Sequence, residues 1–260
     1  MSTTPPGPRV GRPWALTALW VLLMAPLSLA GTALQARTSI PYEVFPLVMV
    51  GPALAALACR LLVPRWFPAP EPSAPTRLVL RSLGATLLVG VVFAAIAAAF
   101  LDGGSAALPA GRGFLPGLVA AVVGLVIGSL LEEIGYRGVM YRALAARMRP
   151  VLAIIVNGVF FGLCHLQYFG AGALAVAFFL LSAVFMDVVI VALWTGSWTQ
   201  RVLLAALFHG VLNVALALIG DPQTSLRSFA VLALSTGAAA LAAVLLGRRL
   251  HIGDLGRAAD

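Results

Sequence analysis

The chain has 260 residues, of which 61% are hydrophobic and only 10% are charged, and its mean hydropathy is +1.02. Soluble domains carry about 25% charged residues, so this composition excludes an ordinary soluble protein and indicates an integral membrane protein. The formal net charge is +8, but the arginines lie between apolar segments rather than in one patch, which argues against nucleic-acid binding.

Eight apolar runs follow one another along the chain and predict transmembrane helices. A hydrocarbon core about 30 Å thick needs roughly 20 apolar residues in a helix. Runs of about this length occupy residues 14–34, 42–63, 78–101, 114–134, 150–169, 171–193, 201–219 and 228–247. Helix-breaking residues separate them, most clearly at 64–75, 102–105 and 221–222. We therefore expect a single all-α membrane domain over residues 1–260, a bundle of about eight transmembrane helices.

The distribution of the arginines predicts the orientation of this bundle. Fourteen of the 17 lie before the first run, in the even-numbered loops or after the last run. The odd-numbered loops hold the other three, which are Arg37, Arg112 and Arg227. Because arginine is enriched in cytoplasmic loops, both termini are expected to be cytoplasmic. The chain is thus predicted to be a multi-pass protein of the cytoplasmic membrane of a bacterium.

The first run has an alternative interpretation. Arg9 and Arg12 precede it and small residues occupy 28–36, a pattern that also fits a cleaved signal peptide. Its length of about 20 residues exceeds the usual apolar region of a signal peptide, which favours an uncleaved first span.

Two adjacent glutamates close the fourth run, in the segment LVIGSLLEEIGYRG at residues 125–138. A charge at membrane depth costs roughly 2.5–3.5 kcal/mol, so such residues are candidates for a functional site. Glu132 and Glu133 diverge around a helix, whereas Glu133 and Arg137 share one face. We expect Arg137 to neutralise and orient Glu133, leaving Glu132 free to act as a general base at the cytoplasmic end of the run. The alternative is a helix-end ion pair with a solvated neighbour.

Two histidines lie in other runs, each with a partner at helical spacing. Phe161 and His165 form one pair, and His209 and Asn213 form the other. Either pair alone also fits polar packing between helices. Together with the glutamate they supply a base, a polarising group and hydrogen-bond donors, the components of water-mediated acyl hydrolysis. Asp187, in the middle of the sixth run, is expected outside the catalytic set, either as an extra polar contact in the bundle or lining a water path.

Three segments resemble the motifs of a known family. EEIGYRG at 132–138, FGLCH at 161–165 and HGVLN at 209–213 are similar to the EExxxR, FxxxH and HxxxN motifs of the CAAX prenyl endopeptidase and bacteriocin-processing (CPBP) family of intramembrane proteases. TGSW at 195–198 resembles the family's usual lead-in to the third motif, whereas Tyr136 stands where the family usually has phenylalanine. The resemblance covers a core of about residues 114–215.

This resemblance implies an endopeptidase that hydrolyses a peptide bond in a membrane-proximal peptide or protein. The implied catalytic residues are Glu132, His165, His209 and Asn213. The implied supporting residues are Glu133, Arg137 and Phe161. In this interpretation Glu132 activates water with help from His165, while His209 and Asn213 stabilise the oxyanion of the tetrahedral intermediate.

Members of this family are often labelled metalloproteases, but we expect no obligatory metal here. The sequence has no HExxH motif, and no carboxylate lies at ligand spacing from either histidine. The alternative is a zinc ion held by Glu132, His165 and His209.

Two other classes of function compete with proteolysis. A non-catalytic immunity or scaffold protein that retains the protease fold would be expected to have lost a catalytic position, and all are present. A small proton-coupled transporter would be expected to show an internal repeat, and none is evident.

Overall fold

The computed structural model describes residues 11–42, 44–101, 114–220 and 223–257. It is 82% helical, and the described residues contain no strand. The predicted all-α membrane bundle is therefore confirmed. Arg9, Arg112 and the helix-breaking segments at 102–105 and 221–222 lie outside the described residues.

Helices account for all eight apolar runs. They are α1 (Pro13–Gln35), α2 (Val50–Leu62), α3 (Thr76–Phe100), α4 (Phe114–Gly135), α6 (Pro150–Leu163), α7 (Ala173–Leu193), α8 (Trp198–Ile219) and α9 (Leu226–Leu250). Six are long and apolar enough to cross a membrane, with α4 extended to Ala145, while α6 and the segment Leu47–Leu62 are shorter. Eight crossings and cytoplasmic termini remain predictions.

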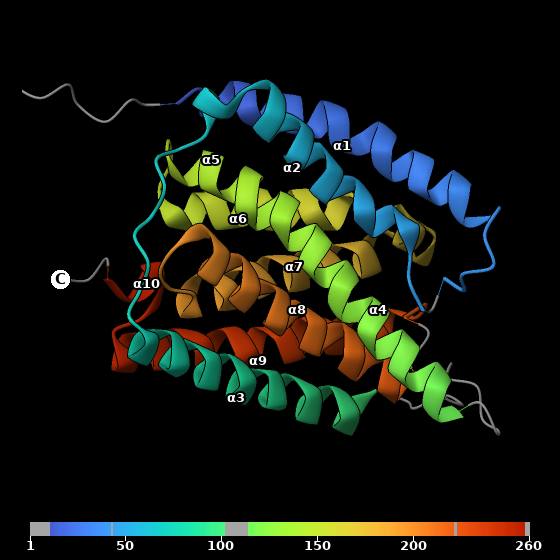
Figure 1. Cartoon of the computed structure of the whole chain (residues 1–260). Coiled ribbons are helices and arrows are strands. Elements are labelled where there is room, and N and C mark those ends of the chain that lie inside the picture. Colours follow the sequence, from blue (N-terminus) through green and yellow to red (C-terminus); the bar gives the residue numbers. More distant parts are fainter. Residues whose placement is uncertain (1–10, 43, 102–113, 221–222, 258–260) are drawn as a thin grey trace, which may run out of the picture.

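Successive helices run in alternating directions, so that alternate connections gather at the same end of the bundle (Figure 1). The described ends of the chain lie at one end, together with the α2–α3, α4–α6 and α7–α8 connections. We call this the arginine-rich end. Its arginines include Arg60, Arg65, Arg142, Arg147, Arg149 and Arg201.

Helices α4, α6 and α8 carry the three sequence motifs. Together with α7 they occupy the middle of the bundle. Helix α4 packs against α2 and α8, and α7 packs against α6 and α9. Helix α1 covers α2, and α3 covers α8 and α9 (Figure 1). Side chains on the inner faces of α4, α6, α7 and α8 therefore meet in a region shielded from lipid.

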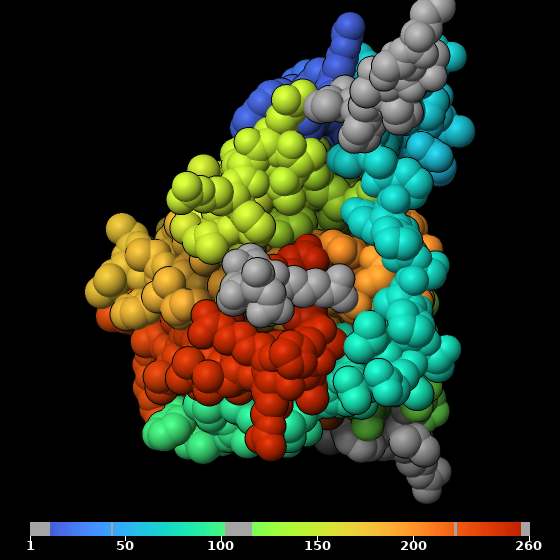
Figure 2. Space-filling model, turned by 90° about the vertical axis from the view of Figure 1, so that its left-hand side faces the viewer, coloured from blue at the N-terminus to red at the C-terminus, as the bar shows by residue number. Residues whose placement is uncertain are grey.

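An extended loop at residues 67–75 runs along the arginine-rich end from α2 to α3, and it is part of the cyan band in Figure 2. Hydrogen bonds to Gln200 and Arg142 fix it at Ala74, Glu71 and Ala69, the last through Arg142 Nη2 at 3.0 Å. The side chain of Gln200 accepts a hydrogen bond from Ala74 N at 2.9 Å and donates one to Ala74 O at 3.1 Å. Arg142 Nε donates to Glu71 Oε1 at 2.7 Å. Gln200 also forms a capping box with Ser197 at the N-terminus of α8. The TGSW stretch at 195–198 therefore leads into this helix.

The fourth helix continues well past the apolar run that predicts it. After α4 it passes through a π-helical segment, η3 (Tyr136–Tyr141), into α5 (Arg142–Ala145), and its apolar part is 30 residues long. The sequence-based placement of Glu132 at the end of its span is wrong, because this residue lies near the middle of the continuous helix. Arg137 is fully buried rather than a loop residue. Without Arg137, thirteen arginines still lie at the termini or in the even-numbered loops, compared with three in the odd-numbered loops. The predicted orientation is therefore unchanged.

Candidate active site

Glu133, Arg137 and Asp187 form a buried charge network that joins α4, η3 and α7. All three are 0% exposed. Arg137 Nη1 donates to Glu133 Oε1 at 2.7 Å, which is the contact that their spacing predicts. Arg137 Nε donates to Asp187 Oδ1 at 2.6 Å, and the guanidinium lies 4.9 Å from the centre of the Phe161 ring. A buried charge is costly unless it is paired, so the two carboxylates account for the burial of the guanidinium.

Asp187 is thus a polar contact within the bundle, the first of the two roles expected for it. Its second carboxylate oxygen accepts a hydrogen bond from Asn157 Nδ2 at 2.8 Å. Asn157 is fully buried in α6 and was missed by the sequence analysis. The available signal was a single amide side chain in the middle of the apolar run 150–169, but nothing in the sequence pairs it with Asp187.

His209 lies between the two glutamates. Its Nδ1 is 2.8 Å from Glu133 Oε1, and its Nε2 is 3.7 Å from Glu132 Oε2. Because Glu133 Oε1 already accepts from Arg137, we assign the Nδ1 proton of His209 as the donor to the same oxygen. Nε2 is then directed towards Glu132.

Glu132 differs from Glu133 in its partners. Its side chain is 10% exposed, and it makes no hydrogen bond to any other described residue. Glu133, in contrast, is held by both Arg137 and His209. The predicted divergence of the two carboxylates is therefore present: one is fixed in a network and the other is unbonded beside a histidine.

His165 lies outside the helix in which the sequence analysis places it. Helix α6 ends at Leu163, and His165 precedes a 3₁₀ segment, η4 (Leu166–Ala171). The side chain nevertheless remains beside Phe161, with ring centres 4.6 Å apart. Its Nδ1 lies 2.9 Å from the carbonyl oxygen of Phe161. Since a carbonyl only accepts, Nδ1 carries the proton and Nε2 of the neutral ring is an acceptor.

Asn213 is oriented by a residue that the sequence analysis missed. Its Nδ2 donates to Ser129 Oγ at 3.0 Å, and Ser129 Oγ donates to the carbonyl oxygen of Leu125 at 2.8 Å. Ser129 is fully buried one helical turn before Glu133. Its signal in the sequence was a lone hydroxyl in an apolar run, which usually bonds only to its own helix. Ser129 fixes the amide and leaves the second Nδ2 proton of Asn213 free of this bond.

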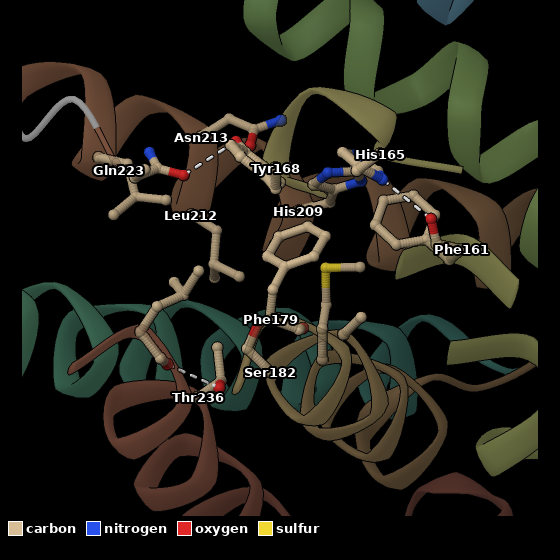
Figure 3. A pocket seen from close by; sticks show the side chains of 14 residues that line it. Phe161, His165, Tyr168, Phe179, Ser182, His209, Leu212, Asn213, Gln223 and Thr236 are labelled. Atoms are coloured by element: carbon tan, nitrogen blue, oxygen red, sulfur yellow. Dashed lines mark hydrogen bonds between the residues drawn. The ribbon is translucent and has the colours of Figure 1, made fainter. Parts of the chain in front are cut away.

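Three of the four predicted catalytic residues line one small cavity (Figure 3). Its volume is about 80 Å³, and His165, His209 and Asn213 are among the residues around it. Phe161 also lines it, with its ring 5.6 Å from that of His209. Tyr168, from η4, donates to Gln223 Oε1 at 3.0 Å on another side of the cavity. Since a water molecule takes up about 30 Å³ of liquid, the cavity has room for a few waters.

The alternative zinc site requires three converging ligands. Among the residues that the structure describes, no three His, Cys, Asp or Glu side chains are grouped so that they would hold a metal ion. Glu132, His165 and His209 in particular do not form such a set. Nδ1 of each histidine is bonded to a protein oxygen, which leaves Nε2 as the nitrogen that could bind a metal. Metal dependence therefore stays a prediction.

Comparison with known proteins identifies the part of the chain that holds this arrangement. The family model described as type II CAAX prenyl endopeptidase Rce1-like matches residues 113–215, from the start of α4 to two residues beyond Asn213. No curated protein sequence matches the chain. The matched segment contains all three motifs and every residue of the network around Arg137. Residues 113–215 thus match the Rce1-like, type II CAAX prenyl endopeptidase family.

Proposed function

We propose that this chain is an intramembrane endopeptidase that hydrolyses a peptide bond of a membrane-proximal peptide or protein. The proposal rests on the surroundings of the Glu132 side chain. This carboxylate is almost buried, has no hydrogen bond to another described residue, and lies 3.7 Å from a histidine beside a cavity with room for water. A carboxylate kept free of structural partners in an apolar interior is suited to accept a proton.

In the proposed mechanism Glu132 takes a proton from the attacking water and later delivers it to the departing amine. His165 assists by accepting a hydrogen bond from the water at Nε2, because its Nδ1 proton is committed to the carbonyl of Phe161. The water then has two acceptors, which hold it and increase its nucleophilicity at the scissile carbonyl.

The oxyanion of the tetrahedral intermediate is assigned to His209 and Asn213. Asn213 has one amide proton bonded to Ser129 and a second that is available to the oxyanion. His209, whose Nδ1 is held by Glu133, is the second donor, from Nε2 when that nitrogen carries a proton. Donors placed in this way stabilise charge that develops in the transition state.

Glu133 acts as a positioning residue in this scheme. It holds His209 through Nδ1, and Arg137 holds Glu133 in turn. Asp187 and Asn157 fix the other side of the guanidinium. The network links the oxyanion histidine on α8 to α4, α6 and α7, so the orientation of the imidazole depends on all four helices.

The test of this function is a comparison of membranes from cells that carry either the wild-type protein or Glu132→Gln as the only copy. We expect one or more membrane-associated proteins to accumulate as longer precursors in the variant, as detected by quantitative proteomics of terminal peptides. Glu71→Gln makes the same chemical change in the loop 67–75 and is expected to leave processing normal. Identical terminal peptides in wild-type and Glu132→Gln membranes would contradict proteolysis and favour a non-catalytic role.

Metal dependence gives a second prediction. We propose that Glu132 activates water without an obligatory metal, because the histidine and glutamate donors do not form a three-ligand set. Purified, active protein is expected to contain far less than one zinc per chain by elemental analysis, and chelators are expected to leave the cleavage rate unchanged. One zinc per chain, with activity that disappears on chelation and returns on adding zinc back, would sink this part of the proposal.

A further inference from the structure

A second, much larger cavity lies on the other side of α4. Its volume is about 680 Å³, within the range of roughly 300–1,000 Å³ typical of small-molecule sites. It is formed by α2, the start of loop 67–75, α4 with η3, and the first residue of α8. Its apolar lining includes Leu54, Leu57, Leu131, Ile134, Val139 and Trp198.

The chemistry of this cavity restricts what fills it. Its charged lining residues are two arginines, Arg60 and Arg142, and the remaining lining residues are uncharged. Apolar cavities of this kind exclude water and take up apolar ligands. In a bundle of helices that spans a bilayer, the apolar material at hand is the hydrocarbon chain of a lipid.

The two arginines determine which lipid fits. Arg142 is neutralised by Glu71, whose Oε1 lies 2.7 Å from Arg142 Nε. Arg60 forms no ion pair with any described residue; its guanidinium lies 5.5 Å from the centre of the Phe67 ring, and Nη1 donates to the carbonyl of Pro64 at 3.5 Å. The cavity therefore carries a net positive charge at the arginine-rich end. Basic pockets between transmembrane helices bind anionic lipid headgroups.

We propose that this cavity binds one anionic phospholipid, with an acyl chain against α2 and α4 and its phosphate at Arg60. The proposal does not rest on the proposed proteolysis. It has a consequence for the site nonetheless, since Leu131 and Ile134 line the lipid cavity while their neighbours Glu132 and Glu133 face His209. A bound acyl chain supports the outer side of the helix whose inner side carries the carboxylates.

The test uses the full chain, purified in detergent and exchanged into nanodiscs or mixed micelles. We compare phosphatidylglycerol with phosphatidylcholine of the same acyl chains, and with inorganic phosphate alone. One phosphatidylglycerol per chain is expected to survive delipidation in native mass spectrometry and to raise the melting temperature, whereas phosphatidylcholine and inorganic phosphate do neither. An equal effect of inorganic phosphate would assign the site to a free anion and overturn the lipid proposal.

Three variants locate the lipid. Arg60→Gln is expected to weaken phosphatidylglycerol binding about fivefold and to reduce its preference over phosphatidylcholine. Arg65→Gln removes an exposed positive charge outside the cavity and is expected to leave binding unchanged. Leu57→Trp adds bulk inside the cavity and is expected to reduce retention of phosphatidylglycerol. Equal binding of the two lipids, equal losses in Arg60→Gln and Arg65→Gln, or full retention by a folded Leu57→Trp protein would each overturn the proposal.

Discussion

Replacing Glu132 by glutamine is expected to abolish peptide cleavage and leave the fold intact. Glutamine has nearly the same size as glutamate but cannot accept the proton of the attacking water, and general acid–base groups contribute about 10²–10⁴-fold to rates. Because Glu132 makes no hydrogen bond to another described residue and its contact with His209 Nε2 is 3.7 Å long, the loss of its charge is expected to cost little stability. The measurement is the initial rate of cleavage of an accumulated precursor by purified protein, with a thermal melt in the same detergent.

Glu133→Gln is the matched control, since it makes the same change one residue along the chain. Glu133 is bonded to Arg137 and His209, so its replacement is expected to lower the melting temperature as well as the rate. His165→Ala is expected to resemble Glu132→Gln, with cleavage lost and folding retained. Should the Glu132→Gln protein cleave at the wild-type rate, the proposed hydrolase mechanism fails.

Arg137→Ala is expected to have the largest effect on stability. Arg137 is the shared cation of Glu133 and Asp187, and all three side chains are fully buried. Removing one partner of a buried pair costs about 3–5 kcal/mol, because it leaves an uncompensated charge in a medium of low polarity. Here two carboxylates lose their partner, so we expect little folded protein in membranes, measured by the yield of monodisperse protein and by its melting temperature.

Two further variants separate lost charge balance from lost volume. Arg142→Ala removes an arginine of the same helix whose partner Glu71 is partly exposed, and it is expected to destabilise the protein less than Arg137→Ala. Combining Arg137→Met with Glu133→Gln and Asp187→Asn removes all three charges at similar volume and is expected to restore folding without restoring cleavage. If Arg137→Ala were no more destabilising than Arg142→Ala, the network would not be the stabilising element described above.

Much of the fold follows from the sequence because the bilayer allows few alternatives. A chain in hydrocarbon must satisfy its backbone hydrogen bonds internally, so apolar runs of sufficient length become helices. This is why the eight runs correspond to helices, and why the i,i+4 spacing of Glu133 and Arg137 predicts their ion pair. Each of these inferences depends only on residues close together in the sequence.

The remaining features depend on contacts between distant segments. Asp187 lies 50 residues from Arg137, and Asn157 lies 30 residues from Asp187. No local pattern in either run indicates these pairs. The early end of α6 was also missed, because the residues from Cys164 to Phe169 remain largely apolar although the backbone leaves the α-helix before His165. The composition of this segment does not indicate where the α-helix ends.

The π-helical segment η3 sets how the two parts of the fourth helix are turned relative to each other. A π turn contains more residues than an α turn, so the side chains before Tyr136 and after Tyr141 do not follow one helical wheel. If the same residues formed a regular α-helix, everything beyond them would be rotated by about 100° relative to α4. Arg142 would then turn away from Glu71, and the carbonyl of Gly138 from the indole N–H of Trp198 that now donates to it at 3.0 Å. The contacts of Arg142 and Gly138 therefore depend on the π-helical backbone of this segment, and not only on the residues that make them.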